Sequence, residues 1–148
     1  MNGFRGAAVQ GFYFDDLSVG QTAEMSRVVG AADIEAFAEV SGDLNPVHLD
    51  EAYAKTTTFG ERIAHGMLSA AYISALLGTR LPGPGVIYLS QSLRFRRPVK
   101  IGDVVVARVT VKTLNASRAH VTLDTTCEVS GKTVVEGEAL VIAPRRPA

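Results

Sequence analysis

The chain has 148 residues, of which 47% are hydrophobic, and its 15 basic and 15 acidic side chains cancel to a net charge of zero. This length suits one domain that buries a core of its own, which excludes a disordered tail and a disulfide-stapled mini-protein. The neutral balance lacks the basic excess of nucleic-acid-binding proteins, so a nucleic-acid partner is not expected.

Composition at the two ends predicts weakly ordered tails. Residues 1–12 are rich in glycine and residues 144–148 contain two prolines, so we expect flexible tails on one domain that spans 1–148. The N-terminal stretch has no apolar signal-peptide core, and the longest uncharged run, 63–79, is shorter than the ~20 residues that cross a bilayer. A single cysteine, Cys127, rules out an intrachain disulfide and fits a reducing compartment. We therefore expect a cytoplasmic protein without a membrane partner.

The first half of the chain is predicted to be extended and then helical. Residues 14–29 form an extended lead-in with a short strand over 22–29. From Asp33, apolar residues recur at helical spacing, which predicts a helix that ends at Gly42, where glycine commonly stops a helix. A second, short helix is expected after Asp50, because aspartate is a good N-cap.

Between these helices lies the eight-residue stretch SGDLNPVH (41–48), which concentrates an acid, an amide, a turn-former and a histidine. Helical spacing does not place Asp43 and His48 face to face, whereas a turn at Asn45-Pro46 can bring them together. The same residues are good turn-formers in their own right, so plain turn chemistry is the alternative interpretation. We take this stretch as the candidate chemical centre.

The second half contains one apolar helix followed by four strands. Residues 64–83 carry apolar side chains all around a helical wheel, which is typical of a buried helix. Alternating apolar and polar residues then predict strands over 86–98, 104–114, 119–129 and 133–142. One antiparallel sheet wrapped around one helix predicts an α+β protein with the hot-dog arrangement. Its open sheet edges and remaining apolar surface predict a homodimer.

Three segments carry a resemblance to a known family: FAEVSGDLNPVHLDEAYA (37–54), IAHGMLSA (63–70) and SLRFRRPVKIGD (92–103). They resemble the R-specific enoyl-CoA hydratases, within the MaoC-like dehydratase family, and the similarity extends over about residues 14–142. The resemblance implies a hot-dog fold, a homodimer, and the reversible hydration of trans-2-enoyl-CoA to (R)-3-hydroxyacyl-CoA. It implies acyl thioesters of coenzyme A as substrates.

The resemblance also implies roles for individual residues. The family's catalytic acid falls on Asp43, its histidine on His48, and the glycine whose N–H binds the thioester carbonyl on Gly66. Addition of water needs a base, a proton donor and an oxyanion hole, and no metal or organic cofactor; coenzyme A enters only as part of the substrate. We assign Asp43 as the base that activates a water molecule, which His48 orients while it helps to deliver the proton. Because the two groups titrate as a coupled pair, this division can be reversed.

Four further residues are candidates for binding substrate or shaping the site. Asn45, on which the family's asparagine falls, shapes the loop, and Ser69 adds a hydrogen bond one turn after Gly66. Gly66 itself opens the apolar helix, where a free N–H faces developing negative charge and glycine allows close approach. Arg94 and Arg96 either bind the phosphates of coenzyme A or form the exposed face of a strand.

Other interpretations stay open at this point. His65 is interpreted as a residue at a helix start and Cys127 as a core residue, because no base lies near that thiol in the sequence. Asp43 and His48 fall short of a usual metal-ligand set, so no metal is expected. A thioesterase of the same fold and a non-catalytic acyl-thioester binding module are the alternative functions. The carrier of the acyl group, coenzyme A or acyl carrier protein, is left open.

Overall fold

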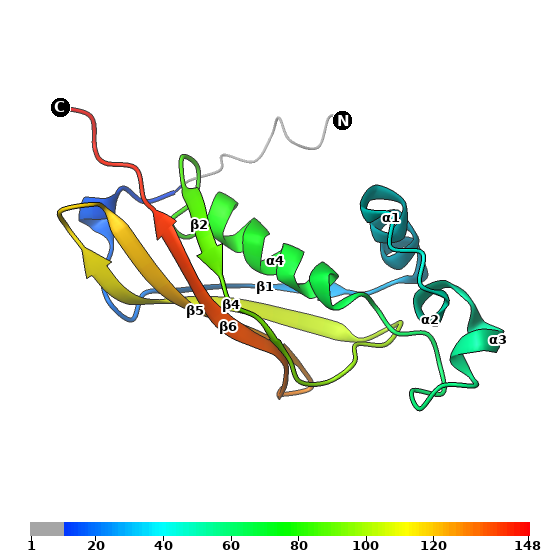
Figure 1. Cartoon of the computed structure of the whole chain (residues 1–148). Helices are drawn as coiled ribbons and strands as arrows, with labels where there is room; N and C mark the ends of the chain where they lie inside the picture. Colours follow the sequence, from blue (N-terminus) through cyan, green and yellow to red (C-terminus); the bar gives the residue numbers. More distant parts are fainter. Residues whose placement is uncertain (1–10) are drawn as a thin grey trace.

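A computed structural model describes residues 11–148, in which a curved sheet packs along one long helix (Figure 1). The helices are η2 (Phe14–Asp16, a 3-10 turn), α1 (Ala31–Ser41), α2 (Pro46–Leu49), α3 (Glu51–Ala54) and α4 (Gly66–Thr79). The strands are β1 (Thr22–Val28), β2 (Ile87–Gln91), β3 (Arg94–Phe95), β4 (Val104–Asn115), β5 (His120–Val129) and β6 (Lys132–Ile142).

The six strands form one antiparallel sheet in the order β1-β4-β5-β6-β2, with β3 paired to β6. The β5–β6 hairpin turns at Ser130 and Gly131, whose φ angles of 51° and 77° are both positive. Such a two-residue turn matches the right-handed twist of the strands that it joins. The sheet and the helix along its concave face confirm the predicted α+β, hot-dog architecture.

The core lies between α4 and one face of the central strands. Every second residue of β4 from Val105 to Val111 is at most 1% exposed, as the predicted alternation requires. Ile73 and Leu76 of α4 pack against this face and are fully buried. Each fully buried aliphatic side chain stabilises the fold by about 1.5–3 kcal/mol, so this contact fixes α4 on the sheet.

One side of α4 stays open, although its sequence predicts burial all around. Met67 is 53% exposed, and Ala71 and Ser74 also face outward. The exposed side chains of Tyr88 and Leu89 on the edge strand β2 line the same groove and continue this surface. We call the surface formed by these five residues the open face. Within residues 11–148, no helix combines the length and apolarity that crossing a bilayer requires.

The single strand expected over 86–98 is wrong, because the chain forms β2 and β3 with a break between them. At the break, Ser92 donates its N–H to the carbonyl of Glu138 at 2.9 Å. A Cβ placed on Gly137 would lie 1.8 Å from the carbonyl oxygen of Ser92. The main chain thus passes very close to β6 at Gly137 before β3 pairs with β6 again.

The described parts of the two ends lie beside each other (Figure 1). Phe12 donates its N–H to the carbonyl of Pro82, and Phe14 donates to Pro144, both at 2.7 Å. Residues 1–10, which include most of the predicted N-terminal tail, lie outside the described residues. The flexibility of both tails stays a prediction.

Removal of a core side chain from α4 should destabilise the fold. Leu76→Ala deletes a fully buried side chain that packs against the sheet, and we expect the free energy of unfolding to fall by ~2–5 kcal/mol. Chemical denaturation at a fixed protein concentration measures the change. Val40→Ala, at a position that is 83% exposed, is the control and should alter stability by less than ~0.5 kcal/mol. Equal effects of both variants would contradict the assigned core.

Candidate active site

Helix α1 ends at Ser41, the first residue of the candidate chemical stretch. Gly42 adopts a left-handed φ of 78° and donates its N–H to the carbonyl of Ala38 at 2.9 Å. This conformation is costly for residues with a side chain and common for glycine, which explains the predicted helix end. The chain therefore leaves the helix direction at Gly42, and Asp43 is the first residue after this change of direction.

Two local side-chain contacts shape the segment between α1 and α2. Asp43 Oδ1 accepts the N–H of Asn45 at 3.2 Å, and Asn45 Oδ1 accepts the N–H of Val47 at the same distance. Asn45 thereby caps α2, and Pro46 occupies the first helical position, where proline is well tolerated. His48 accordingly lies in a short helix and not in a loop. The side chain of Asn45 binds the backbone of this helix.

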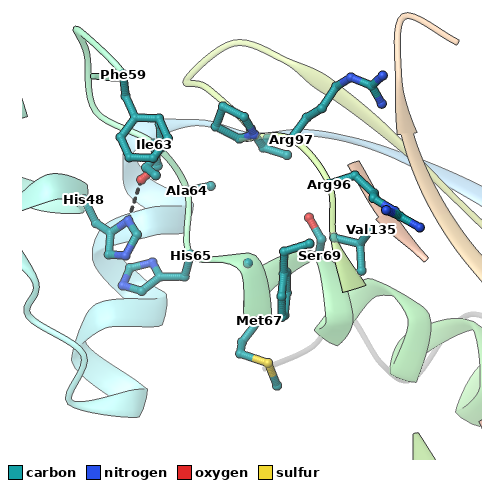
Figure 2. A pocket seen from close by; sticks show the side chains of 14 residues that line it. His48, Phe59, Ile63, Ala64, His65, Met67, Ser69, Arg96, Arg97 and Val135 are labelled. Atoms are coloured by element: carbon teal, nitrogen blue, oxygen red, sulfur yellow. Dashed lines mark hydrogen bonds between the residues drawn. The ribbon is translucent and has the colours of Figure 1, made fainter. Parts of the chain in front are cut away.

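His48 is held in one tautomer. Its side chain is largely buried, and Nδ1 lies 2.7 Å from the carbonyl oxygen of Ile63 (Figure 2). A carbonyl only accepts hydrogen bonds, so Nδ1 carries the hydrogen and donates it. In the neutral ring, Nε2 is therefore left with a free lone pair. Arg62 Nε donates to the carbonyl of His48 at 2.7 Å and secures the main chain there.

The turn brings the two predicted catalytic side chains together. A carboxylate oxygen of Asp43 and ring nitrogens of His48 and His65 all lie within 4.8 Å of one another. One water molecule with hydrogen bonds of 2.7–3.0 Å bridges a carboxylate and an imidazole across such a span. Asp43 is exposed and His48 is buried, so the pair stands at the border between solvent and the protein interior.

His65 contacts both members of the pair. Its Nε2 lies 3.0 Å from the main-chain oxygen of Asp43, so this nitrogen carries the hydrogen and donates it. Its ring stacks on the ring of His48 with centroids 3.9 Å apart and planes inclined by 27° (Figure 2). The sequence placed His65 at the start of the helix, and it is indeed the N-cap residue of α4. Its contact with His48 was not foreseen.

Asp43, His48 and His65 are close enough together to be considered as metal ligands, but two features of the rings argue against that role. A zinc ion needs lone pairs that converge on one point about 2.0–2.1 Å from each nitrogen. The two imidazole rings lie face to face, and each uses one nitrogen on a carbonyl oxygen. The arrangement therefore favours acid–base chemistry, and the absence of a metal stays a prediction.

A cavity of about 410 Å³ opens beside His48 and His65. Its walls are mostly apolar (Figure 2), and they comprise Phe59, Ile63, Ala64, Met67, Phe95, Pro98, Val99 and Val135. Gly66 and the buried Ser69 of α4 also line it. Met67 contributes both to this cavity and to the groove beside β2, so the cavity and the open face share a wall.

Gly66 begins α4 at the wall of this cavity. Its N–H belongs to the first turn, where no intrahelical acceptor exists, and no acceptor for it occurs within residues 11–148. The positive end of the helix dipole adds to the attraction for negative charge there. A Cβ at this position would lie 2.6 Å from the ring of Phe95, so glycine permits the close approach of that ring.

The structure separates the two arginines that the sequence grouped. Arg96 lines the cavity, but it also forms an ion pair with Glu136, with Nε donating to Oε1 at 2.8 Å. Arg94 lies instead in a separate polar hollow with Asp124, Glu136 and Glu138. Carboxylates lie near both arginines and offset part of each charge, so the difference between them is that Arg96 lines the cavity and Arg94 does not.

Cys127 occupies the position expected of a core residue. Its side chain is fully buried in β5, and its thiol donates to the carbonyl of Ser69 at 3.5 Å. Burial raises the pKa of the thiol to about 12. The thiol is therefore protonated at neutral pH, and nucleophilic catalysis by Cys127 is disfavoured.

Comparison with known proteins agrees with this geometry. The sequence profile of the family described as a MaoC like domain matches residues 17–138. The (R)-specific enoyl-CoA hydratase of Rhodospirillum rubrum is 56% identical over 134 residues, which cover 90% of this chain and 93% of that protein. The 3-hydroxybutyryl-CoA dehydratase of Methylorubrum extorquens is 50% identical over 90% of this chain and 85% of that protein.

Solved structures give the same result. The unliganded R-hydratase PhaJ1 from Pseudomonas aeruginosa superposes with a TM-score of 0.88 at 50% identity, covering 92% of this chain and 88% of that chain. The match of the family profile covers well over half of the chain. The chain belongs to the MaoC-like dehydratase family and shares the hot-dog fold of its R-hydratases.

Proposed function

We propose that the protein catalyses the reversible hydration of trans-2-enoyl-CoA to (R)-3-hydroxyacyl-CoA. The observation that carries this proposal is the cavity that both His48 and Gly66 line, with the carboxylate of Asp43 within 4.8 Å of a ring nitrogen of His48. The relatives named (R)-specific enoyl-CoA hydratase and 3-hydroxybutyryl-CoA dehydratase support it. Those two names describe opposite directions of one type of reaction.

The Asp43–His48 pair activates one water molecule. The carboxylate of Asp43 and Nε2 of neutral His48 are both acceptors, so each takes one hydrogen of the same water. This leaves a lone pair of the water oxygen to attack the β-carbon. Asp43 is the base, His48 orients the water, and the proton that the pair takes up goes to the α-carbon. One hydroxyl and one hydrogen are thereby added, and general acid–base catalysis of this kind contributes ~10²–10⁴ in rate.

The start of α4 stabilises the charge that forms during the reaction. As the oxygen attacks the β-carbon, electrons move to the thioester oxygen and an enolate develops. The N–H of Gly66 donates to that oxygen, and Ser69 adds a hydrogen bond from the next turn. One such donor is worth on the order of 10²–10³ in turnover.

Arg96 is our candidate for the phosphates of coenzyme A, since it lines the cavity and is half exposed. Arg94, which lines a separate hollow with Asp124, Glu136 and Glu138, is assigned to the exposed polar surface. Asn45 positions the pair by capping α2. Acyl carrier protein is the alternative carrier, because the thioester chemistry is the same for both.

We also propose that a second copy of the chain covers the open face. Apolar side chains on α4 and on the edge strand β2 remain exposed there, which is typical of a protein interface. A homodimer would bury them. The cytoplasmic location predicted from the sequence remains part of this proposal.

The reaction type can be tested with crotonyl-CoA, a trans-2-enoyl thioester. We expect its conjugated absorbance to fall after addition of the protein, with no release of free thiol, and chiral analysis should identify the R alcohol. A thiol reagent distinguishes the alternatives, and the buried Cys127 should not interfere. Release of coenzyme A would favour a thioesterase, and no change at any chain length would favour a binding module. Formation of the S alcohol would contradict the proposed stereochemistry.

Substitution of the pair should abolish most of the activity. Asp43→Asn removes the base and His48→Gln removes the second acceptor, so each should lower kcat at least ~100-fold while the fold is kept. Circular dichroism checks the fold. Asp124→Asn and His120→Gln, on the polar surface of β5, are matched controls that should retain activity. Near-normal turnover of either pair variant would refute the site assignment.

A methyl group at Gly66 should disturb the oxyanion site. In Gly66→Ala the new Cβ displaces the ring of Phe95, and we expect kcat/KM to fall on the order of tenfold to a hundredfold. The loss should be smaller when Phe95→Ala is already present. Gly78→Ala on the same helix is the control, because its new Cβ would meet no atom of residues 11–148 within 4 Å. Equal kinetics of Gly66→Ala and the control would contradict the role of Gly66.

A further inference from the structure

We propose that His65 is a positioning residue that holds the Asp43–His48 pair in register with the N–H of Gly66. This inference rests on the hydratase function proposed above. His65 is only 3% exposed, and its side chain makes no capping hydrogen bond to α4. Its side-chain contacts reach both catalytic candidates instead.

The first contact fixes the main chain of Asp43. Within residues 11–148, the other hydrogen bonds of Asp43 stay in its own turn: its N–H donates to Ser41 Oγ at 3.1 Å, and Oδ1 accepts from Asn45. The bond from His65 Nε2 to the Asp43 carbonyl, at 3.0 Å, links this turn to α4 across 22 positions of the chain. A turn held by local bonds alone leaves the carboxylate free to shift relative to the cavity.

The second contact fixes the ring of His48. The carbonyl of Ile63 holds Nδ1, and the His65 ring lies 3.9 Å from the His48 ring, centroid to centroid. The edge of the His48 ring is therefore held by Ile63 and its face by His65, and both residues belong to segment 63–66. The same segment supplies the N–H of Gly66. It is attached to the segment that leads into β4, because Ala64 donates its N–H to the carbonyl of Val99 at 2.7 Å.

The chemistry of the ring argues against simple packing. His65 Nδ1 is buried and has no hydrogen-bond partner within the described residues. Phenylalanine would fill the same space, beside Phe37 and under His48, without an unpaired nitrogen. The histidine is therefore explained by its Nε2–H, which donates to the Asp43 carbonyl. Segment 63–66 consequently sets the distance between the water-activating pair and the oxyanion donor.

Kinetics of two variants test this role. His65→Phe keeps a stacked ring and loses the donor, and we expect kcat for crotonyl-CoA to fall on the order of tenfold, with KM changed by less than about twofold. His65→Gln places an amide donor at similar reach and should recover part of kcat. His120→Gln is the matched control. Unchanged kcat in His65→Phe, or a lower melting temperature with normal kcat, would overturn the proposal.

A double-mutant cycle separates positioning from general damage. If His65 acts through Asp43, His65→Phe should lower kcat by less than about twofold when Asp43→Asn is already present. An equal loss in both backgrounds would overturn the proposal. Should His65→Phe not fold, His65→Gln and His65→Leu give the comparison, and equal kcat values would count against it. A wild-type protein without hydratase activity would instead defeat the proposed function itself.

Discussion

The hydrogen bond between His48 Nδ1 and the carbonyl of Ile63 is the contact on which the site depends. It joins two segments separated by 15 positions, and it determines which ring nitrogen is left as an acceptor. In a mostly buried position the ring has few alternative partners, so the tautomer is set by the fold. Under the proposed mechanism, a reversal of this tautomer would present an N–H where the attacking water needs an acceptor.

This contact persists because the sheet holds the segment that provides it. Ile63 pairs with Lys100 in an isolated bridge, and Ala64 bonds to Val99, so the residues before α4 are attached to the chain that leads into β4. Helix α4 is in turn fixed by its buried side against the sheet. The packing of the core therefore fixes the position of segment 63–66, and this segment in turn fixes the geometry of the site.

Local sequence rules predicted most of the elements that surround the site. Alternation identified the buried face of β4, and Gly42 marked the end of α1 because its φ is positive. The proline turn correctly indicated that Asp43 and His48 meet. These features depend on residues that are close in the chain, which explains why the sequence was sufficient for them.

Features that depend on contacts between distant segments could not be predicted. The break between β2 and β3 requires the passage of Ser92 over Gly137, which no pattern within 86–98 reveals. Arg96 met a carboxylate from β6, and the stacking of His65 on His48 joins separate helices. A histidine next to a helix-opening glycine was the only sequence signal for that contact.

Met67 lines both the cavity and the groove beside β2, so it separates the cavity from the open face. Under the two proposals above, a second copy on that face would also exclude water from one side of the cavity assigned to the thioester. By mass action, specific activity would then vary with enzyme concentration, falling on dilution as the covered form dissociates. Specific activity and the fraction of dimer would then follow the same dependence on protein concentration.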